Sequence, residues 1–243
     1  MNEIKMLFHR GNMSLNSREY VNYCFSLTKK LSNIVAMENI YFLGYEDPMK
    51  IDLIDGSTYD RILECILDDE LKYEKDLDGS FVSDSGFLSS WQIKLSEESS
   101  INIRYTLGAG ERSNLGNNIL IDVNLPSEKL LESNTDRIWS ETIKFFHPER
   151  ARVTCSDIDR ELNPDLGVDF NLGVVNYFSE NINLESFKEE FGVEVNMKKF
   201  SKGTEFLLEN GFSLSFKKST IENLKILQKY MIDNGYISDD DGF

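Results

Sequence analysis

Apolar residues recur at intervals of three and four near both ends of the chain, and this spacing predicts helices. The first predicted helix covers residues 16–35, and Asn16 has a side chain suited to the N-cap. The best-defined helix covers residues 219–235, where Ser219 and Glu222 have capping-box spacing and an Asn–Gly pair ends the pattern. This C-terminal helix has an apolar stripe and is expected to pack on a sheet.

Two shorter helices are predicted in the interior of the chain. Residues 57–71 open with a Ser57–Asp60 capping pattern and then run into acidic, turn-rich sequence. Residues 137–147 have apolar side chains at helical spacing, and the proline that follows cannot continue a helix. Residues 160–171 contain a proline and a glycine and are expected to form a loop.

Short β-prone runs fill the middle of the chain and return in its second half. Asn210–Gly211 separates the last two runs and is a strong hairpin signal. Strands and helices are mixed without regular βαβ alternation, which predicts an α+β fold with mixed or antiparallel sheets and flanking helices. The predicted strands are an apolar run before Gly44 and residues 87–95, 101–107, 118–125, 151–157, 172–179, 192–200, 204–210 and 212–216.

The length of the chain limits the number of domains. With 243 residues, 40% of them hydrophobic, the chain can bury one large core or two small ones. We see no internal repeat and no long linker, so we expect a single domain over residues 1–243. The alternative is two lobes that divide near residues 126–136.

The formal net charge of −16 restricts the partners. Carboxylates repel nucleic-acid phosphates and anionic lipids, so we expect neither nucleic acid nor membrane as a partner. The charge favours either solubility alone or a basic protein partner. The three cysteines form no CxxC pair, and the chain has neither a membrane-spanning apolar run nor the apolar core of a secretory signal. We therefore expect a soluble cytoplasmic protein.

A glycine-rich stretch, TLGAGERSNLGNN at residues 106–118, raises the question of a phosphate site. A dinucleotide loop needs GxGxxG before a helix, and here Ser113 occupies the third glycine position. A P-loop needs GK[ST], which is absent, and a strand is predicted to follow. We interpret the stretch as a long hairpin loop, because glycine and asparagine tolerate positive φ.

Candidates for catalysis are weak. His9 and His147 belong to no Cys–His or Ser–His–Asp grouping in the sequence. The SDIDRELNPD run alternates carboxylates, but Leu162 occupies the position where a calcium loop needs glycine. Glu70 and Lys72 have the ExK spacing of metal-dependent nucleases, yet they trail a predicted helix inside an acidic run. We therefore expect no catalytic residue, no metal site and no cofactor.

Carboxylates gather in two clusters. Residues 60–84 contain nine carboxylates against three basic residues, and a second cluster covers residues 157–169. Each cluster is either a solvated face or a docking surface for a basic partner. The candidate binding residues are Asp68, Asp69, Glu70, Glu74, Asp76, Asp157, Asp159, Glu161 and Asp165, with Glu111 and Arg112 at the tip of the glycine-rich loop.

A recognisable pattern appears in the second half: WSETIKFFHPERARVTC, then NPDLGVDFNLGVVNYFS, then a hairpin around NGFSLSF. It resembles the immunity protein 52 family, in which a Gly-led strand has the pattern GW–x–x–Y. Gly173 and Tyr177 match this pattern, whereas Val174 replaces the usual aromatic residue. The segment INIRYTLGAGERSNLGNNILIDVNLP also resembles the family, through Gly108, Asn117 or Asn118, and Pro126. The resemblance covers roughly residues 85–217.

The resemblance implies an α+β fold, no catalysis and a protein partner. Members of the family are encoded beside bacterial polymorphic toxins of contact-dependent competition, including type VI secretion, and each neutralises its own toxin. That toxin is often a nuclease of restriction-endonuclease type. We therefore expect an immunity protein that binds a basic, nuclease-type toxin stoichiometrically. The alternatives are a metal-dependent hydrolase that uses its acidic residues and a non-catalytic adaptor domain.

Overall fold

The structure is a computed structural model, and its chain divides into two compact units, Met1–Pro148 and Glu149–Phe243. Each unit is described separately. The prediction of a single domain concerns independent folding and stays a prediction. The structure describes residues 3–37, 39–44, 47–67, 73–76, 79–94, 96, 99–109, 116–124, 128–162, 171–200, 202–208 and 218–238.

The first unit is built on an antiparallel sheet with the strand order β1-β8-β7-β6-β2-β3. A separate hairpin, β4 (Glu74–Lys75) with β5 (Phe81–Val82), follows the second helix. The sheet strands are β1 (Glu3–Arg10), β2 (Ile40–Leu43), β3 (Met49–Lys50), β6 (Ser85–Lys94), β7 (Ser100–Ala109) and β8 (Asn117–Asn124).

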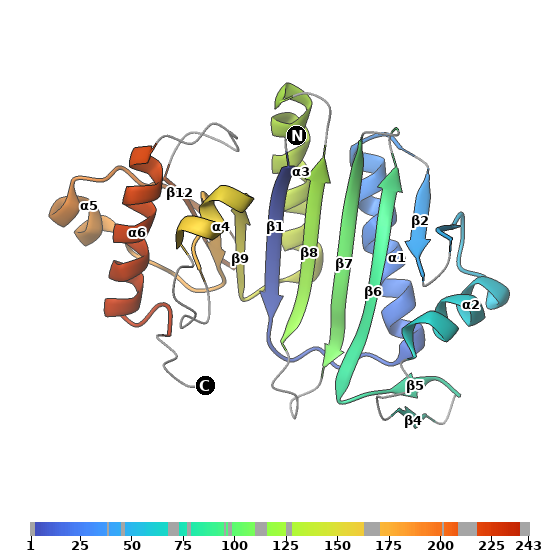
Figure 1. Cartoon of the computed structure of the whole chain (residues 1–243). Helices are drawn as coiled ribbons and strands as arrows, with labels where there is room; N and C mark the ends of the chain where they lie inside the picture. Colours follow the sequence, from blue (N-terminus) through green and yellow to red (C-terminus); the bar gives the residue numbers. More distant parts are fainter. Residues whose placement is uncertain are drawn as a thin grey trace. The chain divides into compact units, whose positions relative to one another are not determined.

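Two long helices, α1 (Ser17–Ile34) and α3 (Glu128–Phe146), lie on the same face of this sheet, as Figure 1 shows. Alternate strand side chains are buried against them, so one face of the sheet forms the core and the other carries the polar residues. Trp91 is fully buried, and the ring of Phe42 meets it edge-on with 5.4 Å between centroids. A third helix, α2 (Gly56–Ile66), contacts α1 and β6.

A buried polar cluster joins α1 to the sheet. The Tyr20 hydroxyl donates to Ser89 at 2.6 Å, and the Tyr105 hydroxyl donates to the carbonyl of Cys24 at 3.2 Å. Thr28 Oγ1 lies 2.8 Å from the Tyr105 hydroxyl. Because these groups satisfy one another, the cluster can lie in an apolar core without a large desolvation cost.

The sequence patterns of the first unit are largely confirmed. Asn16 caps α1, and Glu19 completes a capping box that the sequence analysis did not name. The N-cap of α2 is Asp55 and not Ser57, because the Asp55 carboxylate accepts the N–H of Thr58 at 2.8 Å. Several further features were not predicted: the strand β1, the short strands β3, β4 and β5, and the extension of α3 back to Glu128.

The second unit has an antiparallel sheet with the strand order β11-β12-β10-β9. The predicted α+β class is confirmed, and the C-terminal helix is present. Gln228 on that helix accepts the N–H of Leu172 at 2.9 Å and donates to Asn171 at 2.7 Å. The elements are β9 (Arg150–Thr154), β10 (Val175–Phe178), β11 (Asn196–Phe200), β12 (Gly203–Leu207), α4 (Ser156–Leu162), α5 (Glu185–Phe191) and α6 (Lys218–Asp233).

Three expectations for the second unit change. Residues 156–162 form α4, so residues 160–162 are helical where a loop was predicted, and the strand predicted to reach residue 157 ends at Thr154. Ser219 lies inside α6, which starts at Lys218, and is therefore not its N-cap. Helix α5 was not predicted. The hairpin expected at Asn210–Gly211 and the strand expected at 212–216 lie outside the described residues.

Candidate functional site

The two ends of the glycine-rich stretch belong to adjacent strands, with Thr106 to Ala109 in β7 and Asn117 and Asn118 in β8. Gly108 has a φ of +92°, a conformation that favours glycine. Both strand ends are therefore parts of a sheet, and β8 follows where a phosphate-binding loop would need a helix. Residues 110–115, including Glu111 and Arg112, lie outside the described residues.

The first acidic cluster is described only in part. Glu74 lies on β4 and Asp76 directly after it, and both are exposed. The N–H of Gly79 donates to the Asp76 carbonyl at 3.0 Å. Asp68, Asp69 and Glu70 lie outside the described residues.

The second acidic cluster differs, because its described carboxylates pair with basic groups of the same unit. Asp159 Oδ1 lies 3.3 Å from Arg152 Nη1 and accepts the hydroxyl of Thr154 at 3.0 Å. Glu161 lies 3.4 Å from Lys225 of α6. These two carboxylates are therefore less available to a partner. Asp165 lies outside the described residues, and of Asp157 only its place in α4 is described.

Burial gives the Arg152–Asp159 pair a structural role. Desolvation lowers the pKa of the Arg152 guanidinium, and the charge of Asp159 opposes that shift. The Arg152 Nε is buried and makes no hydrogen bond. The neighbouring carboxylate thus stabilises a cation that would otherwise be buried without compensation.

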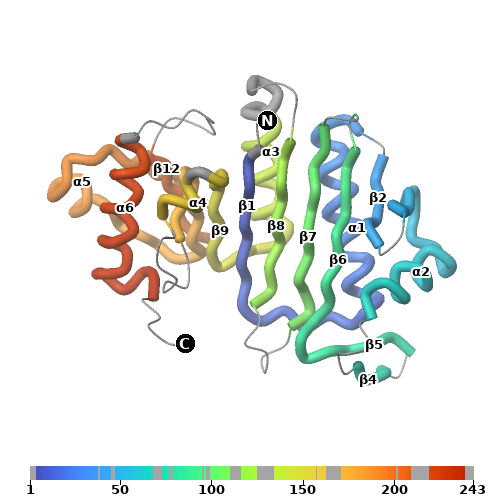
Figure 2. The backbone as a smooth tube through the Cα atoms, in the orientation of Figure 1, coloured from blue at the N-terminus to red at the C-terminus, as the bar shows by residue number. Residues whose placement is uncertain are grey.

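Exposed carboxylates of the first unit gather beside α2, on a surface that we call the acidic edge. In Figure 2, the part of the chain that carries this surface, residues 47–67 and 73–76, lies on the β2 side of the sheet. The N–H of Thr58 holds the pKa of Asp55 below its ordinary value, so this carboxylate stays charged at neutral pH. The described residues 47–67 and 73–76 include seven exposed carboxylates and three exposed basic side chains. The carboxylates are Asp47, Asp52, Asp55, Asp60, Glu64, Glu74 and Asp76, and the basic residues are Lys50, Arg61 and Lys75.

The face of the first sheet that points away from α1 and α3 has a different character. Its side chains alternate with the buried ones and include Asn102, Arg104 and Asp122. Gln92 donates to Asn102 at 2.8 Å across paired strands, and Leu88 is 58% exposed. Because amides and both signs of charge are interspersed here, this face is not acidic. Among the described residues, the acidic edge therefore differs in charge from this face of the sheet.

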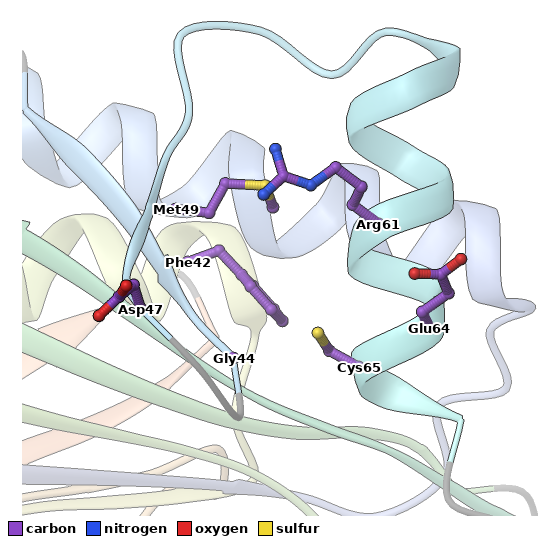
Figure 3. A pocket seen from close by; sticks show the side chains of 7 residues that line it. All are labelled: Phe42, Gly44, Asp47, Met49, Arg61, Glu64 and Cys65. Atoms are coloured by element: carbon purple, nitrogen blue, oxygen red, sulfur yellow. The ribbon is translucent and has the colours of Figure 1, made fainter.

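A cavity of about 330 Å³ opens within the acidic edge. Figure 3 shows its lining: Phe42 of β2 and Cys65 of α2 point toward each other, and the side chains of Met49 and Arg61 converge above them. The sequence pattern does not reveal this cavity, since its residues come from two separate segments, 42–49 and 61–65. The full lining is Phe42, Gly44, Asp47, Met49, Arg61, Glu64 and Cys65.

The part of the chain that the structure describes contains no group of three or more His, Cys, Asp and Glu side chains placed to hold a metal ion. His9 lies 3.0 Å from the side-chain oxygen of Asn118, and its ring fills the space beside Gly116. Within the same residues, no helix combines the length and the apolar character that crossing a membrane requires.

Similarity to known proteins is found among solved structures. No family model matches the chain, and no curated protein matches it. Among solved structures, it is similar to the Pseudomonas aeruginosa T6SS protein PA0821, with a TM-score of 0.49 and 8% sequence identity. The alignment covers 93% of this chain and 75% of that chain. The likeness is too distant to support a functional argument, and the resemblance to the immunity protein 52 family stays a hypothesis.

Proposed function

We propose that the protein is an immunity protein that binds a cognate basic toxin and neutralises it without catalysis. The observation that carries the proposal is the acidic edge, where exposed carboxylates outnumber basic side chains by seven to three. A concentrated negative surface accelerates encounter with a positive partner and selects against acidic ones. The sequence resemblance supports the same function, because it implies a protein partner and no chemistry.

The mechanism is stoichiometric occlusion. A nuclease toxin needs a basic surface to hold nucleic-acid phosphates. Carboxylates on short, fixed elements such as α2 and the β4–β5 hairpin can occupy that surface in place of phosphates. Long-range attraction then raises the association rate, and close packing at the interface sets the lifetime of the complex.

The proposal is tested with the purified protein and the product of the adjacent toxin gene. We expect a one-to-one complex and growth rescue when both are expressed together. The association rate should fall by about tenfold or more between about 50 mM and about 500 mM salt, since exposed charges are screened over these concentrations. Absence of binding together with absence of rescue would reject the proposed function.

Charge reversal locates the docking surface. Changing Asp52, Asp60 and Glu74 to lysine should slow association, because all three are exposed carboxylates of the acidic edge. The matched control reverses Glu185, Glu189 and Glu190 of α5, which are exposed and change the net charge equally. Equal slowing by both triple variants would show that net charge alone matters, and the acidic edge would lose its role.

A further inference from the structure

The cavity beside α2 has an apolar interior and a charged rim. The Phe42 ring and the Cys65 side chain form its inner wall, and Met49 lies at its upper end in Figure 3. Asp47, Arg61 and Glu64 line it as exposed residues, so their charges meet solvent at the opening. Such a site can enclose a hydrocarbon chain and leave a polar end group outside.

Gly44 keeps the inner wall open. A Cβ atom at this position would lie 3.1 Å from Cys65 Sγ and 3.5 Å from the ring of Phe42. Its φ lies outside the left-handed region, so the lack of a side chain here matters for space and not for backbone conformation. A larger side chain at this position would occupy the cavity.

Charge complementarity selects the occupant. The rim carries two carboxylates against one guanidinium, and the surrounding acidic edge adds Asp52, Asp55 and Asp60. An acidic side chain would be repelled there, and a short apolar one would make no use of the rim. A lysine or arginine has several methylene groups for the inner wall and a cation for the carboxylates.

We propose that the cavity lined by Phe42, Gly44, Met49 and Cys65 receives a lysine or arginine side chain of the basic partner. The side chain would lie along the Phe42 ring and direct its charge to Asp47 and Glu64. This inference rests on the proposed function and adds a specific anchor to it. A buried anchor of this kind accounts for a large share of the affinity in many interfaces, whereas surrounding charges mainly affect the rate.

The first test measures toxin binding by variants of the cavity. Gly44→Val fills the cavity, and a double Asp47→Asn, Glu64→Gln variant removes the rim carboxylates. Each should weaken affinity about tenfold or more through faster dissociation, as truncation of an interface anchor does. The matched control for the double variant is Glu189→Gln with Glu190→Gln on α5, which changes the net charge equally outside the acidic edge and should leave dissociation unchanged.

Substitution of Arg61 is expected to have the opposite effect, a slower dissociation of the complex. Its guanidinium competes with the incoming cation, so Arg61→Gln should slow dissociation. Lys50→Gln is the control, because Lys50 is an exposed cation of the same edge outside the cavity. Equal effects of the two substitutions would overturn the assignment of the cavity.

A second test needs no toxin and so separates this inference from the proposed function. N-acetyl-arginine amide is titrated into the intact protein, with N-acetyl-norleucine amide as the neutral probe, and backbone amide shifts are followed by NMR. We expect saturable shifts in Phe42, Gly44 and Cys65 with the arginine probe and much weaker ones with norleucine, all abolished by Gly44→Val. Equal or absent shifts with both probes would reject the cavity as a basic side-chain site, even if toxin binding were normal.

Discussion

The side-chain oxygen of Asn117 accepts a hydrogen bond of 2.7 Å from the backbone N–H of Gly108. The same oxygen accepts the N–H of Ala109 at 3.1 Å, and the Asn117 amide donates to the carbonyls of Ala109 and Gly11. Asn117 is fully buried. The N–H groups that a phosphate cradle would offer at this point are thus already bonded to a side chain of the same sheet.

Asn117→Ala is expected to destabilise the protein by about 2–4 kcal/mol, because it leaves several buried backbone groups without partners. Urea denaturation followed by fluorescence measures the change. Asn118→Ala is the control, since Asn118 is half-exposed and bonds to His9 and to the Gly116 carbonyl. A similar decrease in the free energy of unfolding in both variants would show that the Asn117 hydrogen bonds contribute no more to stability than those of Asn118.

Asp159→Asn should be far more damaging than Glu161→Gln, although both residues lie on α4. Asp159 compensates the buried Arg152, and its loss is expected to cost about 2–4 kcal/mol. Glu161 and Lys225 form an exposed pair, with side chains 53% and 50% exposed, that is worth less than about 1 kcal/mol. Thermal unfolding of the two variants makes the comparison, and an equal effect would contradict it.

Gly173→Ala tests a close approach between strand β9 and the segment that precedes β10. An added Cβ would overlap the carbonyl oxygen of Val153, which already accepts the N–H of Val174 at 2.9 Å. We expect a loss of more than about 2 kcal/mol, because backbone must move to relieve the overlap. Gly192→Ala, at a φ of +66° with open space around it, should cost about 1 kcal/mol. Hydrogen exchange of β9 and β10 amides shows whether the disturbance is local.

Stability should decline in alkaline solution through the buried cluster around α1. Burial raises the pKa of the Cys24 thiol far above its ordinary value of 9.0. Burial likewise raises the pKa values of Tyr20 and Tyr105 above 10.0. Near neutral pH these groups are protonated in both the folded and the unfolded protein, so they add no pH dependence to the stability. Above about pH 9 the unfolded chain releases its thiol proton while the folded chain keeps it, so stability falls as pH rises.

The measurement is the free energy of unfolding between about pH 7 and pH 11. Each group contributes a slope of up to about 1.4 kcal/mol per pH unit above its ordinary pKa. Cys24→Ala should remove the part of the decline that begins near pH 9. Cys155→Ala is the control for the loss of a thiol that is only half-buried. An unchanged alkaline slope in Cys24→Ala would contradict the prediction.

The parts of the fold that were predicted correctly have strong local signals. Asn16 and the apolar stripe after it specify α1, and alternation along 101–107 and 118–125 specifies β7 and β8. Strand β1 has a weaker signal, because Ile4, Met6 and Phe8 alternate but the intervening Leu7 is also apolar. Helix α4 falls between a predicted strand and a predicted loop, because its seven residues give only two turns of periodicity and Asp and Ser also favour turns.

The candidate site was harder to predict, because its geometry depends on packing between segments. The acidic character of residues 60–84 is visible in the sequence, and Glu74 and Asp76 are exposed as a docking surface requires. The pairing of Asp159 with Arg152 depends on how α4 folds back onto β9, which spacing alone does not reveal. The cavity depends on Gly44, whose role is set by Cys65 in a different element.

Cys65 also provides a natural attachment point for a reporter. Of the three free thiols, Cys24 is fully buried, whereas Cys65 is partly exposed and lines the cavity. In a Cys155→Ser background, an environment-sensitive fluorophore on Cys65 would sit where the proposed partner side chain enters. Binding could then be followed in real time in dilute solution, and displacement of the dye would identify the part of the partner that reaches α2.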